Sequence, residues 1–302
     1  MSESRVDIEA EVGAPADAGA GARAAAGAGA GPGPVAGAGP VVGHGPDASG
    51  IALSGVEKAY VGRHVLGPVD LTIERGGVTA LIGPNGAGKS TMLTIIGRLL
   101  EADSGRVTVG GLDVRTAKSK ELARVVSILK QENHFMARLT VRQLVAFGRF
   151  PHSAGRLTET DERAIHAAIA FLDLAGMEDR FIDELSGGQR QRAFVAMVLA
   201  QDTDYVLLDE PLTGLDMRHA VGMMGQVRAA ADGLGKTVVL VIHDVNFAAA
   251  YADRIVALSE GRVVASGTPE EIITSEVLER VFETPVDVIE CDGRRVAVYY
   301  RH

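Results

Sequence analysis

The sequence predicts an α/β fold, with a parallel β-sheet covered on both faces by helices. Short, mostly apolar runs at residues 78–82, 206–208 and 238–242 are typical of parallel strands buried on both faces. Stretches of helical periodicity alternate with these runs, the pattern of a doubly wound sheet with right-handed connections. A glycine-rich loop at residues 83–91 follows the first run. Because ligands of such sheets bind at the carboxyl ends of strands, this loop is the first candidate site.

The first part of the chain reads mainly as strands. Residues 51–82 are rich in strand formers, and a helix is expected over 90–96, directly after the glycine-rich loop. Short strands are expected around 106–114, and a further strand over 125–130.

The second part begins with a helix-rich insertion over residues 139–183, in which the apolar residues of 164–172 recur at helical spacing. Strands and helices then alternate again. Near the C-terminus, apolar segments at 286–290 and 296–300 flank the dipeptide Asp292-Gly293, a hairpin signal. We expect a small accessory hairpin there.

Composition separates a tail from the folded chain. The protein has 302 residues, of which 46% are hydrophobic and 23% charged, enough to bury a full core. Residues 1–49 consist mostly of Ala, Gly and Pro and carry too little large apolar surface to offset the entropy of ordering. We expect a disordered tail there. It does not resemble a signal peptide, because acidic residues surround Arg5 and no apolar core follows.

Several classes of protein are disfavoured. A net charge of -9 and a pI near 5.4, without a basic stripe, argue against nucleic acid as a partner. Apolar runs fall well short of the roughly 20 residues that span a bilayer, so any pore must come from other polypeptides. Cys291 is the only cysteine, so no internal disulfide is possible, which suits the cytosol.

The glycine-rich loop matches the P-loop pattern G-x-x-x-x-G-K-S, whose backbone amides cradle phosphate oxygens at the start of a helix. We assign Lys89 to the β- and γ-phosphates, Ser90 to Mg²⁺ and Thr91 to the α-phosphate. The alternative is a glycine-rich turn with a solvated lysine. The nucleotide-binding residues of the loop are Gly83, Asn85, Gly86, Ala87, Gly88, Lys89, Ser90 and Thr91.

An acidic pair, Asp209-Glu210, ends the apolar run at 206–208. A Mg²⁺–phosphate cluster would supply the positive charge that two carboxylates at a buried strand end require. We assign Asp209 to Mg²⁺ and Glu210 to the general base that activates the attacking water. The alternative is a solvated pair at a strand end.

Leu185-Ser186-Gly187-Gly188-Gln189 lies between the two motifs, where a helix is expected to begin. Ser186 is a plausible N-cap, and the glycines let backbone amides approach an anion. A helix end of this kind is suited to clamp a γ-phosphate. In isolation, the tripeptide Ser-Gly-Gly would be an ordinary helix start.

Along the chain the order is the P-loop, then residues 185–189, then the acidic pair. Three motifs in that order resemble those of ATP-binding-cassette (ABC) proteins. The resemblance to ATPase subunits of prokaryotic importers extends over about residues 51–267. It implies a P-loop NTPase (RecA-like) core with an N-terminal antiparallel β subdomain and an inserted α-helical subdomain. The ABC domain would span 50–275, with its helical subdomain at about 132–183. A C-terminal extension with the hairpin would follow at 276–302.

The resemblance assigns further residues. Tyr60 matches the aromatic residue that stacks on adenine, although a strand tyrosine packed on the sheet is an alternative. Gln131 matches the glutamine that reaches Mg²⁺ and the attacking water. His243, after the run at 238–242, matches the histidine that contacts the γ-phosphate; a lone histidine there would otherwise be packed or solvated.

The resemblance also implies a homodimer, in which ATP on the P-loop of one copy meets residues 186–189 of the other, Gln189 included. Asp216 matches the residue of the loop that crosses the dimer seam. Thr213 and Gly214 depart from the Ser-Ala more usual in that loop, which puts its detailed contacts across the seam in doubt.

The implied partners are two integral-membrane permease subunits and, indirectly, an extracytoplasmic substrate-binding protein, with the ATPase peripheral on the cytoplasmic face of the membrane. Phe135, Met136 and Arg138 are candidates for the surface that receives the permease. Simple packing of Phe135 and Met136 within the subdomain is the alternative.

Residues 128–157 and 198–205 look most like ATPases of iron–siderophore uptake. Haem and cobalamin import remain alternatives. A non-transport cassette protein is a third possibility, although this chain has neither a second cassette nor a long coiled coil. A scaffold that only senses ATP is a fourth; it would keep Lys89 but could dispense with Glu210.

Overall fold

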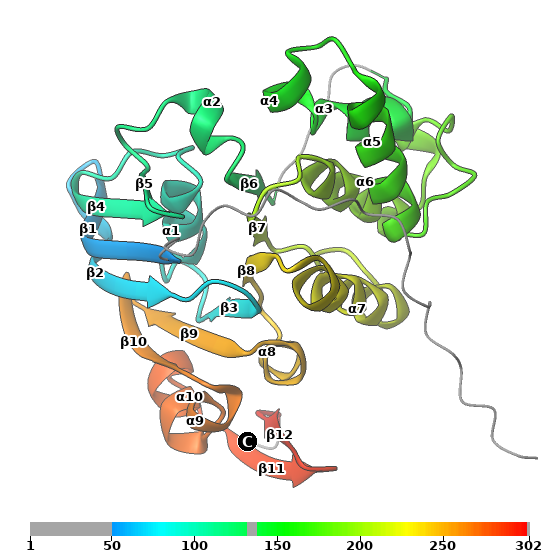
Figure 1. The fold of residues 1–302 in the computed structure, drawn as a ribbon. Helices are drawn as coiled ribbons and strands as arrows, with labels where there is room; N and C mark the ends of the chain where they lie inside the picture. Colours follow the sequence, from blue (N-terminus) through cyan, green and yellow to red (C-terminus); the bar gives the residue numbers. More distant parts are fainter. Residues whose placement is uncertain (1–49, 132–137, 301–302) are drawn as a thin grey trace, which may run out of the picture. The chain divides into compact units, whose positions relative to one another are not determined.

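The computed structural model describes residues 50–131 and 138–300 (Figure 1). The expected disordered tail, residues 1–49, lies outside the described residues, as do Phe135 and Met136. The boundaries proposed for the helical subdomain and the C-terminal extension remain predictions.

The centre of the fold is a six-stranded sheet in the order β10-β9-β3-β8-β7-β6. Five neighbouring strands, from β9 to β6, run parallel, and β10 joins the edge antiparallel to β9. The predicted parallel core is thus confirmed. The strands are β3 (Val78–Ile82), β6 (Val126–Leu129), β7 (Tyr205–Asp209), β8 (Thr237–Val241), β9 (Arg254–Ser259) and β10 (Arg262–Gly267).

The central strands are buried on both faces because their side chains alternate between two apolar layers. Every residue of β3, β7 and β8 is buried. In β7, Val206 and Leu208 belong to the layer formed with α6, α7 and α8, whereas Leu207 belongs to the layer formed with α1 and the N-terminal strands. The apolar runs in the sequence therefore reflect burial from two sides. One face is covered by α1 and a second sheet rather than by helices alone (Figure 1).

That second sheet is antiparallel, in the order β2-β1-β4-β5, as the resemblance implied. The short helix α2 follows it. These elements are β1 (Ile51–Tyr60), β2 (Arg63–Ile73), α1 (Lys89–Ile96), β4 (Ser104–Val109), β5 (Leu112–Asp113) and α2 (Ser119–Leu122).

The expected helical insertion is present, and its helices α3 and α5 pack on α6. Thr140 and Thr158 form capping boxes that begin α3 and α5. Buried Arg149 pairs with buried Asp161 (Nε to Oδ1, 2.9 Å) and donates to the Ala200 carbonyl at the end of α6 (2.7 Å). The elements are α3 (Val141–Phe147), α4 (Phe150–Ser153), α5 (Glu159–Phe171), η1 (Ile182–Glu184) and α6 (Gly187–Ala200).

The C-terminal hairpin is confirmed, with Asp292 and Gly293 both at positive φ in its two-residue turn. Its second strand ends at Val298, within the second of the two segments that flank the turn. Asn246 of α8 exchanges two hydrogen bonds with the backbone of Ala297 and fixes the hairpin. The remaining elements are α7 (Met217–Leu234), α8 (Val245–Tyr251), α9 (Pro269–Ile272), α10 (Ser275–Phe282), β11 (Asp287–Cys291) and β12 (Arg294–Val298).

Within the described ranges, none of the helices has the length and apolar character required to cross a bilayer.

Candidate phosphate site

Strand order explains why residues distant in the sequence meet at one place. The neighbouring strands β3, β8, β7 and β6 run parallel, so their carboxyl ends lie at the same edge of the sheet. The P-loop follows β3, and His243 lies just beyond β8. The acidic pair occupies the end of β7, and Gln131 follows β6.

A cavity of about 480 Å³ lies at this edge. Gln131, Glu210 and His243 line it together with the P-loop. The full lining is Val65, Asn85, Gly86, Ala87, Gly88, Lys89, Ser90, Thr91, Gln131, Glu210 and His243. The structure therefore brings together most of the residues that the sequence assigned to phosphate binding and catalysis.

The P-loop needs glycine at position 88 for two reasons. Gly88 has a φ of 93°, in the left-handed region that side chains disfavour. A Cβ there would also lie 2.9 Å from the Val65 carbonyl oxygen. Gly88 is the N-cap of α1 and, having no side chain, leaves the first amides of the helix without a side-chain cap. These donors and the positive end of the helix fit an anion.

The ammonium group of Lys89 is buried and donates to the carbonyl oxygens of Gly83 (2.8 Å) and Pro84 (2.9 Å). Burial lowers the pKa of Lys89, and the nearby carboxylates of Glu210 and Asp209 partly oppose that shift. A buried cation that donates to two carbonyl oxygens is suited to receive a phosphate group.

Asp209 lies buried at the end of β7, where its Oδ1 accepts a hydrogen bond from Ser90 Oγ (2.8 Å). Burial raises the pKa of Asp209, the Ser90 hydrogen bond lowers it, and Glu210 raises it further. The described residues contain no cluster of three or more His, Cys, Asp or Glu side chains suited to a metal. One hydroxyl and one carboxylate fit Mg²⁺, which commonly takes few protein ligands and completes its shell with phosphate and water.

Both carboxylate oxygens of Glu210 are engaged. His243 Nε2 lies 2.5 Å from Oε1. Gln131 Nε2 (2.7 Å) and Thr213 Oγ1 (3.0 Å) donate to Oε2. Glu210 itself has a φ of 51°, so the backbone turns sharply after the strand. Three side chains from three different loops thus fix the position of this carboxylate.

Residues 186–189 begin α6 as predicted. Ser186 Oγ accepts from the Gln189 amide, and the Gln189 side chain accepts from the Ser186 amide, which completes a capping box. Gly187 and Gly188 form the first turn. None of these four residues lines the cavity of its own chain, as far as the described residues define it.

Four further predicted residues also lie outside that lining: Gly83 and Asp209, which contact Lys89 and Ser90 of the P-loop, and Tyr60 and Asp216. Tyr60 ends β1 with 46% of its surface exposed, and Lys58 Nζ lies 5.7 Å from the centre of its ring. Asp216 caps α7, where its Oδ1 accepts from the His219 amide (2.9 Å).

Comparisons with known proteins identify the family. The family model described as "ABC transporter" matches residues 66–213. A petrobactin import ATP-binding protein, FatE of Bacillus anthracis, is 54% identical over 249 residues, covering 82% of this chain and 100% of FatE. YclP of Bacillus subtilis, also a petrobactin import ATP-binding protein, is 49% identical over 250 residues, covering 83% of this chain and 99% of YclP. The chain belongs to the ABC transporter ATPases.

The fold of this ABC ATPase also matches solved cassettes. A dimeric, post-hydrolysis structure of the ATP-binding cassette MJ0796 with ADP and Pi superposes with a TM-score of 0.65 at 28% identity. The match covers 72% of this chain and 98% of that one. As a member of this family, the protein binds and hydrolyses ATP.

Sequence reasoning missed two side chains of the ATPase site. Val65 lines the cavity from β2, and the sequence around it carries no motif that indicates this role. Thr213 contacts Glu210, although it was noted only as a departure from the family pattern. A hydroxyl group is kept at that position, which was the available signal. The second departure, Gly214, has a φ of 76°, a conformation that favours glycine over the more usual alanine.

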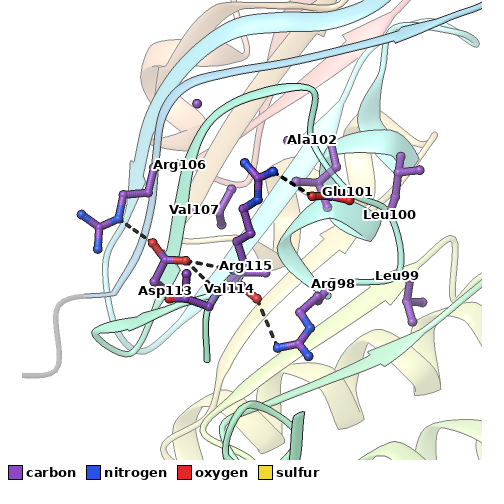
Figure 2. Close-up of a pocket in the computed structure, with 13 residues that line it drawn as sticks. Arg98, Leu99, Leu100, Glu101, Ala102, Arg106, Val107, Asp113, Val114 and Arg115 are labelled. Carbon is purple, nitrogen blue, oxygen red and sulfur yellow. Dashed lines mark hydrogen bonds and ion pairs between the residues drawn. The ribbon is translucent and has the colours of Figure 1, made fainter. Parts of the chain in front are cut away.

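A second pocket, of about 390 Å³, lies between the end of α1 and the strands β4 and β5 (Figure 2). Its guanidinium groups already have partners. Arg106 pairs with Asp113 (2.7 Å) and Arg115 with Glu101 (3.1 Å), while Arg98 donates to backbone carbonyls. It contains none of the predicted site residues.

Proposed function

We propose that this ABC ATPase hydrolyses ATP with Glu210 as general base and so powers import of an iron–siderophore complex. The observation that carries the catalytic part is the placement of Glu210. Its carboxylate lies beside the P-loop cavity, where His243, Gln131 and Thr213 contact it. A base must lie within hydrogen-bond reach of the water that it activates, and phosphoryl transfer depends mainly on positioning and charge neutralisation.

Each side chain of the site has a defined task in this proposal. Lys89 neutralises charge on the β- and γ-phosphates, and the α1 amides hold phosphate oxygens. Ser90 and Asp209, already in contact, hold Mg²⁺, which supplies charge stabilisation when bound. Gln131, which contacts Glu210, is assigned to Mg²⁺ and the attacking water, and His243, which also contacts Glu210, to the γ-phosphate.

The active unit in this proposal is a homodimer. Ser186, Gly187, Gly188 and Gln189 lie at a helix N-terminus suited to an anion but do not line the cavity of their own chain. ATP held by one copy would therefore meet these residues of the other. The dimeric assembly of the MJ0796 cassette, 28% identical to this chain, supports this arrangement.

The ATPase is proposed to act on the cytoplasmic face of the membrane with two permease subunits, which an extracytoplasmic binding protein supplies with substrate. Of the candidate contact residues, Arg138 is described: it pairs with Asp183 and Glu184, and its guanidinium lies 3.9 Å from the centre of the Phe181 ring. Replacing Phe135 and Met136 together should reduce recovery of the ATPase with permease-containing membranes. Unimpaired recovery would remove this surface from the proposal.

A ferric siderophore is the proposed cargo because both Bacillus relatives, at 54% and 49% identity, are petrobactin import ATP-binding proteins. Deletion of the gene should abolish growth on one class of iron chelate, and the intact chain should restore it. A variant carrying Glu210→Gln should not. Restoration by that variant would contradict transport driven by ATP hydrolysis, whereas normal growth on every chelate would point to haem, cobalamin or another cargo.

A further inference from the structure

His219 connects two loops that are separate in the sequence. Its side chain Nδ1 lies 2.7 Å from Oδ1 of Asp216, the residue that caps α7. The other side of the imidazole lies against Gly188: a Cβ on that glycine would be 2.7 Å from Cδ2 and 2.8 Å from Cγ of His219. The ring therefore occupies the space that a side chain at position 188 would take.

The fit is specific to both residues. Only a residue without Cβ allows the ring to approach Gly188 so closely, and the bond to Asp216 fixes where the ring lies. The N-cap of α7 does not need the ring, because the His219 backbone amide already donates to Oδ1 of Asp216. The side-chain contact is therefore additional to what the start of α7 requires.

The two connected segments have different tasks in the proposed dimer. Gly188 belongs to the helix start that would meet the ATP of the other copy. Asp216 ends the loop whose Thr213 contacts Glu210 in the same chain. A contact between Gly188 and Asp216 through His219 thus joins the surface that closes on one ATP to the loop that positions the base for the other.

We propose that His219 is a positioning residue that holds the start of α6 and the loop at residues 212–216 as one unit when two copies close on ATP. This proposal rests on the dimeric function proposed above. Loss of the imidazole leaves each segment intact but lets them move separately. Closure of the dimer then orders two segments instead of one, at an entropic cost that the wild-type protein avoids.

The test uses the full chain carrying Glu210→Gln, so that ATP is bound but turnover is slow. His219→Ala should weaken ATP-dependent dimerisation about tenfold, the scale of one lost hydrogen bond to a charged group. Binding of ADP to the monomer and the unfolding temperature should stay at parental values, because neither requires the second copy. Val221→Ala, at an exposed position in the same turn of α7, is the matched control and should behave as the parent.

Two conservative variants separate the contacts. His219→Asn keeps a donor for Asp216 without the ring, and His219→Phe keeps a ring against Gly188 without the donor. Each should fall between the parent and His219→Ala. In the chain with Glu210 restored, the variants should lower kcat by a larger factor than they raise the KM for ATP. The reason is that the defect lies in closure of the dimer and not in binding of ATP to one copy.

Dimerisation of His219→Ala equal to that of the parent overturns the proposal. If His219→Ala does not fold, His219→Phe decides in the same way. A loss of ADP binding or thermal stability that parallels the loss of dimerisation also overturns it, since His219 would then be a structural residue. If the parent itself fails to dimerise with ATP, the proposed dimeric function fails, and that result is distinct from either outcome for His219.

Discussion

The imidazole Nε2 of His243 lies 2.5 Å from the carboxylate Oε1 of Glu210, across the gap between the ends of β8 and β7. With Gln131 and Thr213 on Oε2, no oxygen of Glu210 is left without a partner. An ionised carboxylate offers roughly four acceptor positions, and these contacts leave Oε1 able to accept a further hydrogen bond from water. The side chains that the proposal assigns to catalysis therefore also fix the position of the base.

Glu210→Gln should reduce phosphate release at least about 100-fold, the usual scale for loss of a general base, because the amide cannot take the proton of water. ATP-dependent dimerisation should persist, since the P-loop and the start of α6 are unchanged. Phosphate release and size-exclusion chromatography with ATP measure the two effects. Asp232→Asn, at an exposed carboxylate on α7, is the control. Normal hydrolysis by Glu210→Gln would remove this residue as the base.

Thr213→Val should lower kcat about tenfold with little change in KM. It keeps the volume of the side chain but removes the hydroxyl that donates to Glu210, and one such hydrogen bond to a charged group accounts for about that factor. Thr213→Ser keeps the hydroxyl and should retain most of the activity. Steady-state kinetics of the two variants check this. Equal rates for Val and Ser would show that the contact does not position the base.

Gly88→Ala should abolish ATP binding and lower the free energy of unfolding by about 1–3 kcal/mol, because the added Cβ meets the Val65 carbonyl at a strained φ. Gly225→Ala is the matched control: Gly225 lies within α7, at ordinary helical φ, with open space around it. That change should leave binding intact and raise stability slightly, by about 0.5–1 kcal/mol. Calorimetric titration and denaturant unfolding measure both. Tight ATP binding by Gly88→Ala would contradict the assigned geometry.

Asp161→Asn should destabilise the chain by about 3 kcal/mol near neutral pH, because it leaves the guanidinium of Arg149 buried without its charge partner. Burial raises the pKa of Asp161, but hydrogen bonds from Thr158 and Arg149 outweigh it and lower the pKa from 3.8 to about 2. The ionised carboxylate therefore stabilises the fold fully above pH 3.8, and this contribution is lost as the pH falls to about 2.

The difference in unfolding free energy between wild type and Asp161→Asn should accordingly shrink over that acidic range. Denaturant unfolding at a series of pH values measures it. Glu159→Gln, at an exposed position in the same turn of α5, should show no comparable pH dependence. A difference that stays constant down to pH 2 would contradict the ion-pair account.

Deletion of residues 1–49 should leave ATPase activity unchanged, because the Ala, Gly and Pro composition of this segment offers no catalytic group. The ATPase rate of the truncated chain checks this directly. A large loss of activity would show that the tail contributes to the enzyme.

Much of the fold followed from local patterns. The apolar runs located β3, β7 and β8, and the P-loop located α1, because each depends on residues that are neighbours in the sequence. Ser186 was predicted as an N-cap for the same reason. The Asp292-Gly293 turn placed the hairpin, whose second strand ends at Val298.

Contacts between distant segments were not predictable in this way. The His219 ring packs against Gly188, which has no Cβ, and so joins residues of two helices. Val65 lines the P-loop cavity from a strand of the other sheet. Neither contact leaves a periodic or compositional signal. The state of Glu210 was also hidden: the sequence indicated separate roles for Gln131 and His243, whereas the structure shows both holding the same carboxylate.

The strand β7 has a consequence for how this enzyme tolerates change. Successive side chains of a strand point to opposite faces, so Asp209 meets Ser90 only because β7 ends where it does. Inserting or removing a single residue within β7 would exchange the directions of Asp209 and its neighbour and leave the wrong carboxylate facing the nucleotide. Insertions and deletions that keep this enzyme active are therefore expected in the loops on either side of β7 and not within the strand, whose length sets the position of Asp209.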